Sequence, residues 1–240
     1  GHSTFGANLT YKTQTDNGQG LYVTGSYFPV LGIKPYLGRL LTPDDDRNIG
    51  GHPVAVLSYP YWANKLGADS SVVGTDILVR GTPMTIVGVT GPDFNGVTVT
   101  HRPFLFIPMT MRAVMSPTSR PVYERRNNYW VYAFARLKNG VTIDRARLAL
   151  NEKYRAILND VEASLQTDMS PETMQKGRAR QVTVEPGRIG QSNMDREART
   201  PIMFLMATTF IVLLIACANI ANLLLARAAD RSTELAVRLS

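Results

Sequence analysis

An uncharged segment near the C-terminus limits the folds open to this chain. Residues 201–226, PIMFLMATTFIVLLIACANIANLLLA, contain no Asp, Glu, Lys or Arg. A helix of this length rises about 39 Å, whereas ~20 apolar residues cross the ~30 Å hydrocarbon core of a bilayer. The six Leu, four Ile, two Phe and one Val of the segment contribute roughly −4 to −8 kcal/mol to membrane insertion. Because the segment is longer and more uniformly apolar than a core helix of a soluble protein, it predicts a transmembrane helix over residues 201–226.

Charged residues follow the predicted span at helical spacing. Arg231, Glu234 and Arg238 lie three and four residues apart, so they share one face of a helix. Residues 227–240 are therefore expected to form a short charged helix at the membrane surface. Two roles stay open from the residues alone, which are docking on a partner protein and solvation of the headgroup region.

Two asparagines lie inside the predicted span. Asn219 and Asn222 are three residues apart and share a helix face. They are candidates for packing against neighbouring transmembrane helices, where each hydrogen bond contributes roughly 0.6–2 kcal/mol. The alternative is that both amides lie at the depth of the membrane interface and meet water.

Short apolar runs separated by Gly and Pro predict a β-rich subdomain over about residues 21–108. The expected elements are a strand at Val54–Leu57, a short helix with Tyr61, Trp62 and Leu66 facing inward, a hairpin of Ile77–Val79 and Met84–Val89 around a turn at Arg80–Pro83, and a strand ended by Pro108. Many short strands of this kind indicate a compact β fold.

A different pattern begins at Tyr129. Apolar residues alternate from Val131 to Leu137, which predicts a strand, and an apolar stripe follows from Ile143 to Leu165 with Thr142 as its N-cap. Ser170-Pro171 is a helix-start signal, and Gln181–Glu185 is a second expected strand. Tyr129–Pro186 is therefore predicted to be a β–α–β unit, and the fold class is α+β. Residues 191–200 are a polar connector to the span.

The charge distribution excludes some functions. The net charge is +7, and residues 1–200 hold 23 Lys and Arg against 17 Asp and Glu. The densest basic run, Arg102 to Arg126, fits either attraction to anionic lipid headgroups or an acidic partner, or a solvated loop. No basic stripe interleaves with aromatic residues at the spacing of a nucleic-acid-binding module, so no nucleic-acid partner is expected.

Signatures of catalysis are missing from the sequence. Neither G-x-x-x-x-G-K-[ST] nor G-x-S-x-G occurs, and the three histidines show no ligand spacing. Asp44–Asp46 follow Thr42-Pro43 and fit a turn or helix start better than a Ca²⁺ loop. Cys217, the single cysteine, lies in the apolar segment, which leaves no disulfide framework. No catalytic, cofactor-binding or metal-binding residue is predicted, and the chain is expected not to be an enzyme.

The tail resembles the start of the FtsX-like permease module in the version that carries a MacB-like periplasmic core domain. The family pattern N-x-x-N-L-L-L-A-R followed by R-x-x-E-[IL]-A-[VI]-R is matched by Asn219–Arg227 and Arg231–Arg238. Upstream, Val23–Asp46 and His52–Val89 are similar to two further phrases of the family. The resemblance covers nearly the whole chain from about Leu21.

This resemblance implies a non-catalytic permease of an ABC transporter of the mechanotransmission type. Residues 1–190 would be the periplasmic core domain, with a porter-like β–α–β part and an inserted β-rich subdomain. The first porter half and first transmembrane helix would precede Gly1, and helices three and four would follow Ser240. Residues 227–240 would begin the FtsX-like domain, with Arg231, Glu234 and Arg238 as docking candidates for an ATPase.

The implied partners are an ABC ATPase that binds the ATP, a second permease copy or duplicated module, a periplasmic adaptor and membrane lipid. Three Arg flank the span on each side, so charge does not decide the orientation of the span. The resemblance instead places residues 1–200 in the periplasm and the span in the bacterial inner membrane. An alternative hypothesis is a membrane-anchored sensor or ligand-binding module. An anchored hydrolase is a third.

Overall fold

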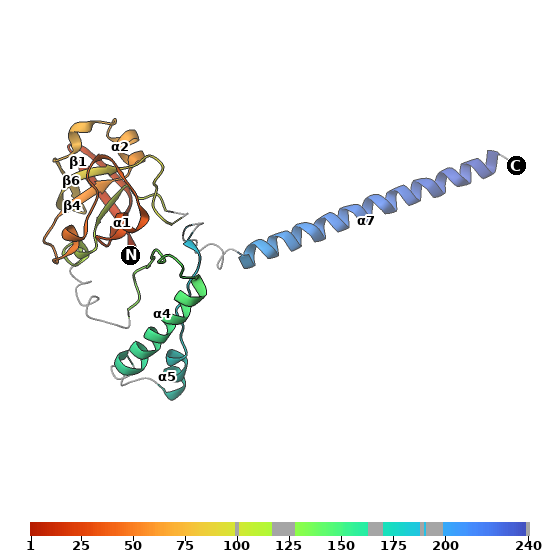
Figure 1. Cartoon of the computed structure of the whole chain (residues 1–240). Helices are drawn as coiled ribbons and strands as arrows, with labels where there is room; N and C mark the ends of the chain where they lie inside the picture. The colour runs from red at the N-terminus through yellow and green to blue at the C-terminus, as the bar shows by residue number, and fades with distance from the viewer. Residues whose placement is uncertain (99–100, 117–127, 163–169, 188–189, 191–198, 239–240) are drawn as a thin grey trace. The chain divides into compact units, whose positions relative to one another are not determined.

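The computed structural model describes residues 1–98, 101–116, 128–162, 170–187, 190 and 199–238. The chain divides into two compact units, Gly1–Gln191 and Ser192–Ser240. Figure 1 shows that the strands belong to the first unit and that the second contains the long helix α7.

A seven-stranded sheet forms the main body of the first unit. Its strands are β1 (His2–Tyr11), β2 (Gln14–Val23), β3 (Pro35–Gly38), β4 (Val54–Leu57), β5 (Asp76–Val79), β6 (Thr82–Thr90) and β7 (Leu105–Pro108). Their order is β3-β6-β4-β7-β2-β1-β5, and an additional β5–β6 pairing joins the end of the sheet back to β6. Six strands therefore form a closed ring, which removes most of the free strand edges.

The hairpin β1–β2 extends the β-rich part beyond the range expected from the sequence. The two strands pair in antiparallel register from His2 opposite Val23 to Tyr11 opposite Gln14. Lys12, at φ 53°, begins the two-residue turn between them, and the Asn8 amide donates to Asn17 Oδ1 across the pair at 2.8 Å. The β-rich subdomain thus starts at His2 and not near Leu21.

Most strand predictions in the rest of the subdomain are confirmed. β4 occupies Val54–Leu57 as expected, β7 ends at Pro108, and β5 and β6 form the predicted hairpin. Its turn is Arg80-Gly81 alone, with both residues at positive φ, so the predicted four-residue turn is two residues too long. The left-handed conformation at both positions suits a tight hairpin, because it matches the twist of the paired strands.

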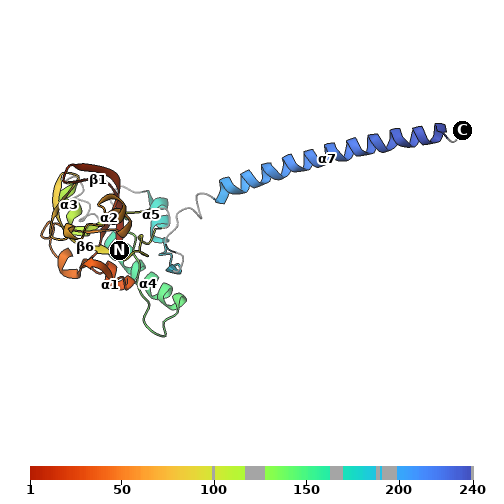
Figure 2. The same cartoon turned by 90° about the horizontal axis from the view of Figure 1, so that it is seen from above.

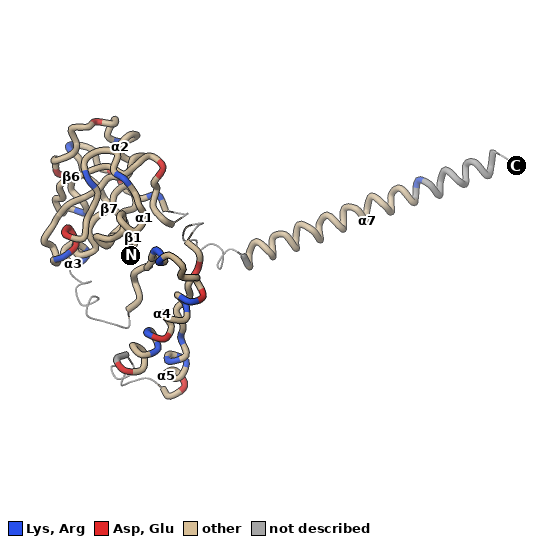
Figure 3. Tube along the Cα trace, viewed as in Figure 1, with Lys and Arg blue, Asp and Glu red and all other residues tan. Residues whose placement is uncertain are grey.

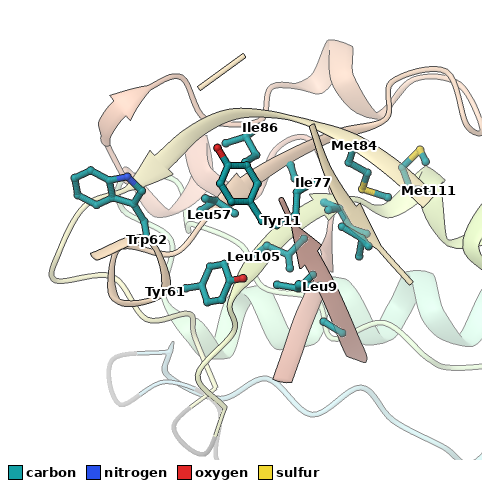
Figure 4. Close-up of a cluster of buried hydrophobic side chains, with 14 of the residues drawn as sticks. Leu9, Tyr11, Leu57, Tyr61, Trp62, Ile77, Met84, Ile86, Leu105 and Met111 are labelled. Carbon is teal, nitrogen blue, oxygen red and sulfur yellow. The ribbon is translucent and has the colours of Figure 1, made fainter. Parts of the chain in front are cut away.

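Two hydrophobic clusters stabilise this subdomain. The larger cluster lies between the sheet and helix α2 (Tyr59–Lys65), with Tyr61 and Trp62 facing inward as predicted, and Figure 4 shows part of it. The smaller cluster combines Leu and Val side chains with four aromatic rings, which we call the aromatic cluster. Its members Tyr27, Phe28, Phe94 and Phe106 contact one another with ring centroids 5.2 to 6.2 Å apart. Tyr27 and Phe28 lie on the short helix α1 (Tyr27–Leu31).

Short helical segments complete the subdomain. They are η1 (Pro43–Asp46), η2 (Ser70–Val72), η3 (Met109–Met111) and α3 (Arg112–Met115). At η1, Asp45 accepts hydrogen bonds from the Thr42 backbone and hydroxyl at 2.8 and 3.0 Å and from both terminal nitrogens of Arg39 at 2.7 and 2.8 Å. This is a capping box reinforced by a bidentate ion pair. Asp44–Asp46 are therefore a helix-start cluster, as the sequence favours.

Helices dominate the remainder of the first unit. Helix α4 (Ile143–Ile157) begins at the predicted cap, where Thr142 Oγ1 accepts from the Arg145 backbone at 3.3 Å. It continues into the π-helical segment η5 (Leu158–Glu162). Helix α5 (Pro171–Arg178) begins at the predicted Ser170 cap. The central helix of the predicted β–α–β unit is thus confirmed.

The prediction of a strand on either side of α4 is wrong. Residues 131–137 make a single isolated bridge, between Tyr132 and His2, and residues 181–186 belong to no ladder. The Asn151 side chain of α4 instead holds the second segment. Its amide donates to the Val182 carbonyl at 3.1 Å and its carbonyl accepts from the Val182 N–H at 2.7 Å. A side-chain amide here provides the hydrogen bonds that a neighbouring strand would supply.

The second unit contains α7 (Arg199–Arg238), which Figures 1 and 2 show as one continuous helix from two directions. The predicted span and the predicted charged helix after it are therefore one element. Arg199 and Thr200, expected in the connector, already belong to α7, and the rest of the connector over 191–198 lies outside the described residues. The α+β class is confirmed, with a mixed sheet and one long apolar helix.

Candidate functional site: a membrane helix and the junction of the soluble unit

The apolar part of α7 has the properties of a membrane span. Thr200–Leu225 is long and apolar enough to cross a bilayer, and its most apolar stretch is not buried in the protein. Leu213 and Leu214, in the middle of the segment, are more than half exposed. Figure 3 shows no charged residue over most of the described length of α7. An apolar surface of this size needs a nonaqueous environment or a partner.

Some of the few polar side chains in this helix form hydrogen bonds with the backbone of the same helix. Thr208 Oγ1 donates to the carbonyls of Phe204 and Leu205 at 3.0 and 2.9 Å, and Thr209 Oγ1 donates to the Leu205 carbonyl at 2.8 Å. A helix in lipid must satisfy its polar groups internally, because no water is available in the bilayer core. Both threonines are therefore compatible with a lipid environment.

Asn219 and Asn222 lie on the exposed surface of α7. Within the described part of the chain, neither side-chain amide has a hydrogen-bond partner. In lipid such amides bond to a neighbouring helix or to water, so their role in helix packing stays a prediction. Arg231, Glu234 and Arg238 also lie within α7, but their side chains fall outside the described residues, and their docking role stays a prediction too.

A compact junction joins the N-terminal strand to the segment before α4. The backbones of His2 and Tyr132 exchange two hydrogen bonds of 2.9 Å, and the two rings stack with centroids 5.7 Å apart. Arg136 donates from Nη2 and Nε to the Val30 carbonyl at 2.9 and 3.2 Å, near the end of α1. These contacts connect the β-rich subdomain with the helical part of the same unit.

The buried histidine of this junction has unusual electrostatics. His2 is 1% exposed, and its Nε2 lies 3.2 Å from Thr98 Oγ1. Within the described part of the chain, Nδ1 is buried without a hydrogen-bond partner. Burial lowers the pKa of His2 from 6.5 to about 4, because a charged imidazolium loses its hydration in an apolar site. The neutral ring of His2 packs among the rings of Tyr27, Tyr132 and Phe134.

This shift in pKa predicts acid sensitivity of the first unit. The unfolded chain takes up a proton on His2 below pH 6.5 and the folded chain only near pH 4, so the His2 contribution to stability is complete above pH 6.5 and falls as the pH drops. At pH 5 the loss is about 2 kcal/mol. We expect Tm in detergent to fall between pH 7 and pH 5, and to fall less in His2→Phe, which keeps an aromatic ring but does not titrate.

The exposed histidine provides the control for this experiment. His52 lies on the surface, and His52→Gln is expected to retain the full pH dependence of Tm. If Tm fell equally with pH in the original protein and in His2→Phe, the assignment of the acid sensitivity to His2 would be contradicted.

Two of the described acidic residues connect separate segments of the fold. Asp46 accepts from the backbone N–H groups of Gly25 and Thr110 at 3.1 and 2.9 Å, and Asp16 pairs with Lys65 at 3.2 Å. Among the described residues, no group of three or more His, Cys, Asp or Glu is placed to hold a metal ion. Cys217 is a free thiol on α7.

The basic run predicted between Arg102 and Arg126 is only partly described. Arg120, Glu124, Arg125 and Arg126 lie outside the described residues. Arg112, on α3, lies over the ring of Trp130 with its guanidinium carbon 3.8 Å from the ring centroid. Sequence patterns miss this contact, because the two residues lie in different segments and no local spacing connects them.

Comparison with known proteins identifies the family. The model of the MacB-like periplasmic core domain matches residues 2–153, which is more than half of the chain. This chain belongs to the MacB-like periplasmic core domain family. The matched range begins at β1 and extends into α4, so the core domain includes the whole sheet and the junction around His2.

Curated relatives of this core domain are longer proteins. The macrolide export ATP-binding/permease proteins MacB of Neisseria gonorrhoeae and Neisseria meningitidis are each 37% identical over 91 residues, which are 38% of this chain and 14% of theirs. The chain therefore spans about a seventh of the length of the curated relatives it matches.

Solved structures give partial likenesses. The periplasmic region of MacB from Actinobacillus actinomycetemcomitans is similar at 15% identity and a TM-score of 0.48, with 76% of this chain and 75% of that chain covered. The extracellular domain of the noncanonic ABC-type transporter YknZ from Gram-positive bacteria is similar at 16% identity and a TM-score of 0.39, with 47% of this chain and 55% of that chain covered.

Proposed function

We propose that this chain is part of a permease subunit of an ABC transporter of the mechanotransmission type. ATP would bind and be hydrolysed on a partner ATPase subunit or domain, and this chain would convey the resulting movement through the membrane to its core domain. The movement would drive export of a substrate. Residues 1–200 would lie in the periplasm, and α7 would cross the inner membrane.

One observation carries this proposal. A MacB-like periplasmic core domain at residues 2–153 is followed in the same chain by an apolar helix at Thr200–Leu225 whose most apolar stretch is not buried in the protein. The curated relatives that share part of the chain are ATP-binding/permease proteins. A core domain and a span in one chain are what a protein needs to connect an energy source on one side of a bilayer with a substrate on the other.

The proposed coupling surface is the last part of α7. Arg231, Glu234 and Arg238 share a face by their spacing, and a partner ATPase with complementary charges would dock there. Asn219 and Asn222 would contact neighbouring helices of a permease dimer or of a duplicated module. A periplasmic adaptor would bind the core domain.

Charge reversal tests the coupling role. The variants Arg231→Glu and Glu234→Arg, made in the full-length protein together with its ATPase, are expected to lower the ATP hydrolysis of the membrane complex about tenfold. A loss of ~1.4 kcal/mol in docking free energy gives a factor of ten in affinity. The measurement is phosphate release from purified complexes in proteoliposomes at equal permease content.

Two controls separate coupling from folding. Arg178→Glu reverses an exposed charge at the end of α5 and is expected to leave ATP hydrolysis unchanged. Alkaline extraction of membranes is expected to show equal insertion of all three variants. Normal hydrolysis in both Arg231→Glu and Glu234→Arg would contradict the docking role.

A further inference from the structure

Two arginines without acidic partners lie at one end of the sheet. Arg80 is the first residue of the tight β5–β6 turn, and Arg112 begins α3. Among the described residues, the ion pairs of the first unit involve other cations, and neither Arg80 nor Arg112 pairs with a carboxylate. Two guanidinium groups in one place without counterions are unusual, because like charges repel each other.

Contacts with shared neighbours bring the two arginines together. Arg80 Nη1 lies 3.5 Å from Ser116 Oγ, directly after α3. Burial raises the pKa of the Tyr22 hydroxyl, and the positive charges of both Arg80 and Arg112 partly offset that rise. The Ser116 N–H also donates to the Arg112 carbonyl, one helical turn earlier, at 2.9 Å, so positions 112 and 116 share one face of this turn. The Tyr22 hydroxyl donates to Met115 Sδ at 3.8 Å.

Arg112 is held in a defined orientation. Its guanidinium carbon lies over the Trp130 ring, 3.8 Å from the centroid, in a cation–π contact. Trp130 packs in turn against the larger hydrophobic cluster. This support fixes the direction of the planar fork before any ligand arrives, which reduces the entropy lost on binding.

One nitrogen of this fixed fork lacks an acceptor. Arg112 Nη1 is buried and has no hydrogen-bond partner within the described part of the chain. Buried donors in folded proteins are nearly always paired, and an unpaired one costs about 1–3 kcal/mol or more when charged. Among the described residues, neither a carboxylate nor an acceptor at this buried nitrogen offsets the positive charge of Arg112.

We propose that Arg80, Arg112 and Ser116 form a binding site for a phosphate group. The planar guanidinium fork matches the oxygens of a phosphate and binds them through two parallel hydrogen bonds. Arg112 supplies the fixed fork, Arg80 supplies a second charge from an exposed turn, and the Ser116 hydroxyl supplies a further donor. The phosphate is presented either by a free phosphate ion or by a lipid headgroup.

Fluorescence of Trp130 reports binding directly. The chain contains two tryptophans, and Trp62 is buried in the core with its Nε1 bonded to the Asp69 carbonyl at 2.8 Å. We expect sodium phosphate, added to the 240-residue chain in dodecyl maltoside at constant ionic strength, to change the emission in a saturable manner. Arg80→Gln and Arg112→Lys are expected to weaken the apparent affinity about tenfold or more, and Arg112→Lys tests the fork because it retains the charge.

The matched control is Arg145→Gln, which removes an exposed arginine from α4 and is expected to leave the titration unchanged. Arg80 lies at an exposed turn, so Arg80→Gln is expected to keep the Tm of the original protein. It therefore tests the site even if Arg112→Lys disturbs folding. An equal loss of affinity in Arg145→Gln would overturn the proposal.

The source of the phosphate is distinguished by two further titrations. Dihexanoyl phosphatidylglycerol is compared with dihexanoyl phosphatidylcholine below their micellar concentrations. If inorganic phosphate produces a saturable change in emission, the ligand is a free phosphate ion. If only phosphatidylglycerol produces one, the ligand is a lipid headgroup. Saturation by neither ligand, or equal saturation by sodium acetate, overturns the proposal. None of these results depends on transport or on an ATPase, so the site and the permease role fail or succeed separately.

Discussion

Two arginines in the middle of α7, in the variant Leu213→Arg/Leu214→Arg, are expected to prevent stable membrane insertion of the 240-residue chain. Each central Leu favours insertion by about 0.3–0.6 kcal/mol, and each central Arg opposes it by about 2.5–3.5 kcal/mol. The double change therefore costs about 6–8 kcal/mol, which is comparable to the roughly −4 to −8 kcal/mol supplied by all Leu, Ile, Phe and Val of the segment.

Alkaline carbonate extraction measures this effect. The original chain is expected to remain in the membrane pellet, and the double-Arg variant is expected to appear in the supernatant or to be degraded. Leu213→Ala/Leu214→Ala, which adds no charge at the same positions, is the matched control and is expected to stay in the pellet. If the double-Arg variant resisted extraction as well as the original chain does, lipid would not be the environment of α7.

The second large effect is expected in the aromatic cluster. Phe106 is fully buried on β7, with ring centroids 5.3 Å from Phe28 and 5.7 Å from Phe94. Phe106→Ala removes a large buried ring and leaves a cavity, which costs about 3–5 kcal/mol. Domains of this kind are stable by about 5–15 kcal/mol, so the variant is expected to lose a large share of its stability.

Urea denaturation followed by tryptophan fluorescence measures the loss. Phe106→Leu fills part of the space and is expected to cost clearly less than Phe106→Ala. Leu148→Ala removes a side chain that is 73% exposed on α4, and is expected to change the midpoint little. A midpoint for Phe106→Ala equal to that of Leu148→Ala would show that the aromatic cluster does not support the fold.

Local sequence patterns were sufficient to predict the position of a strand where strong turn signals border it. The β5–β6 hairpin has alternating buried residues on both strands and a Gly in its turn, so its position followed from the residues. The β1–β2 hairpin lacks such signals. Its turn begins at Lys12, a residue type that seldom adopts a left-handed conformation, and the first half of β2 is polar and largely exposed. Neither feature predicts a strand.

The alternation of apolar residues in a segment does not show whether another strand lies beside that segment to pair with it. The apolar positions from Val131 to Leu137 indicate one face of a strand, yet a strand forms only where another backbone lies alongside. Val131 and Leu137 remain 38% and 43% exposed. The proposed phosphate site could not be predicted from local patterns either. Arg80 and Ser116 approach each other only in the folded chain, and they are 36 positions apart in the sequence.

The continuity of α7 has a mechanical consequence. Its 40 residues form a rod of about 60 Å without a break, and the 13 residues after Leu225 make up about 20 Å of this length. A torque applied at Arg238 is therefore transmitted along the whole rod, since no loop is present to absorb it. The rotation of one end of the helix relative to the other, about the helix axis, is fixed as well. One residue inserted after Leu225 turns everything that follows by about 100°, while four inserted residues bring it back to within about 40°.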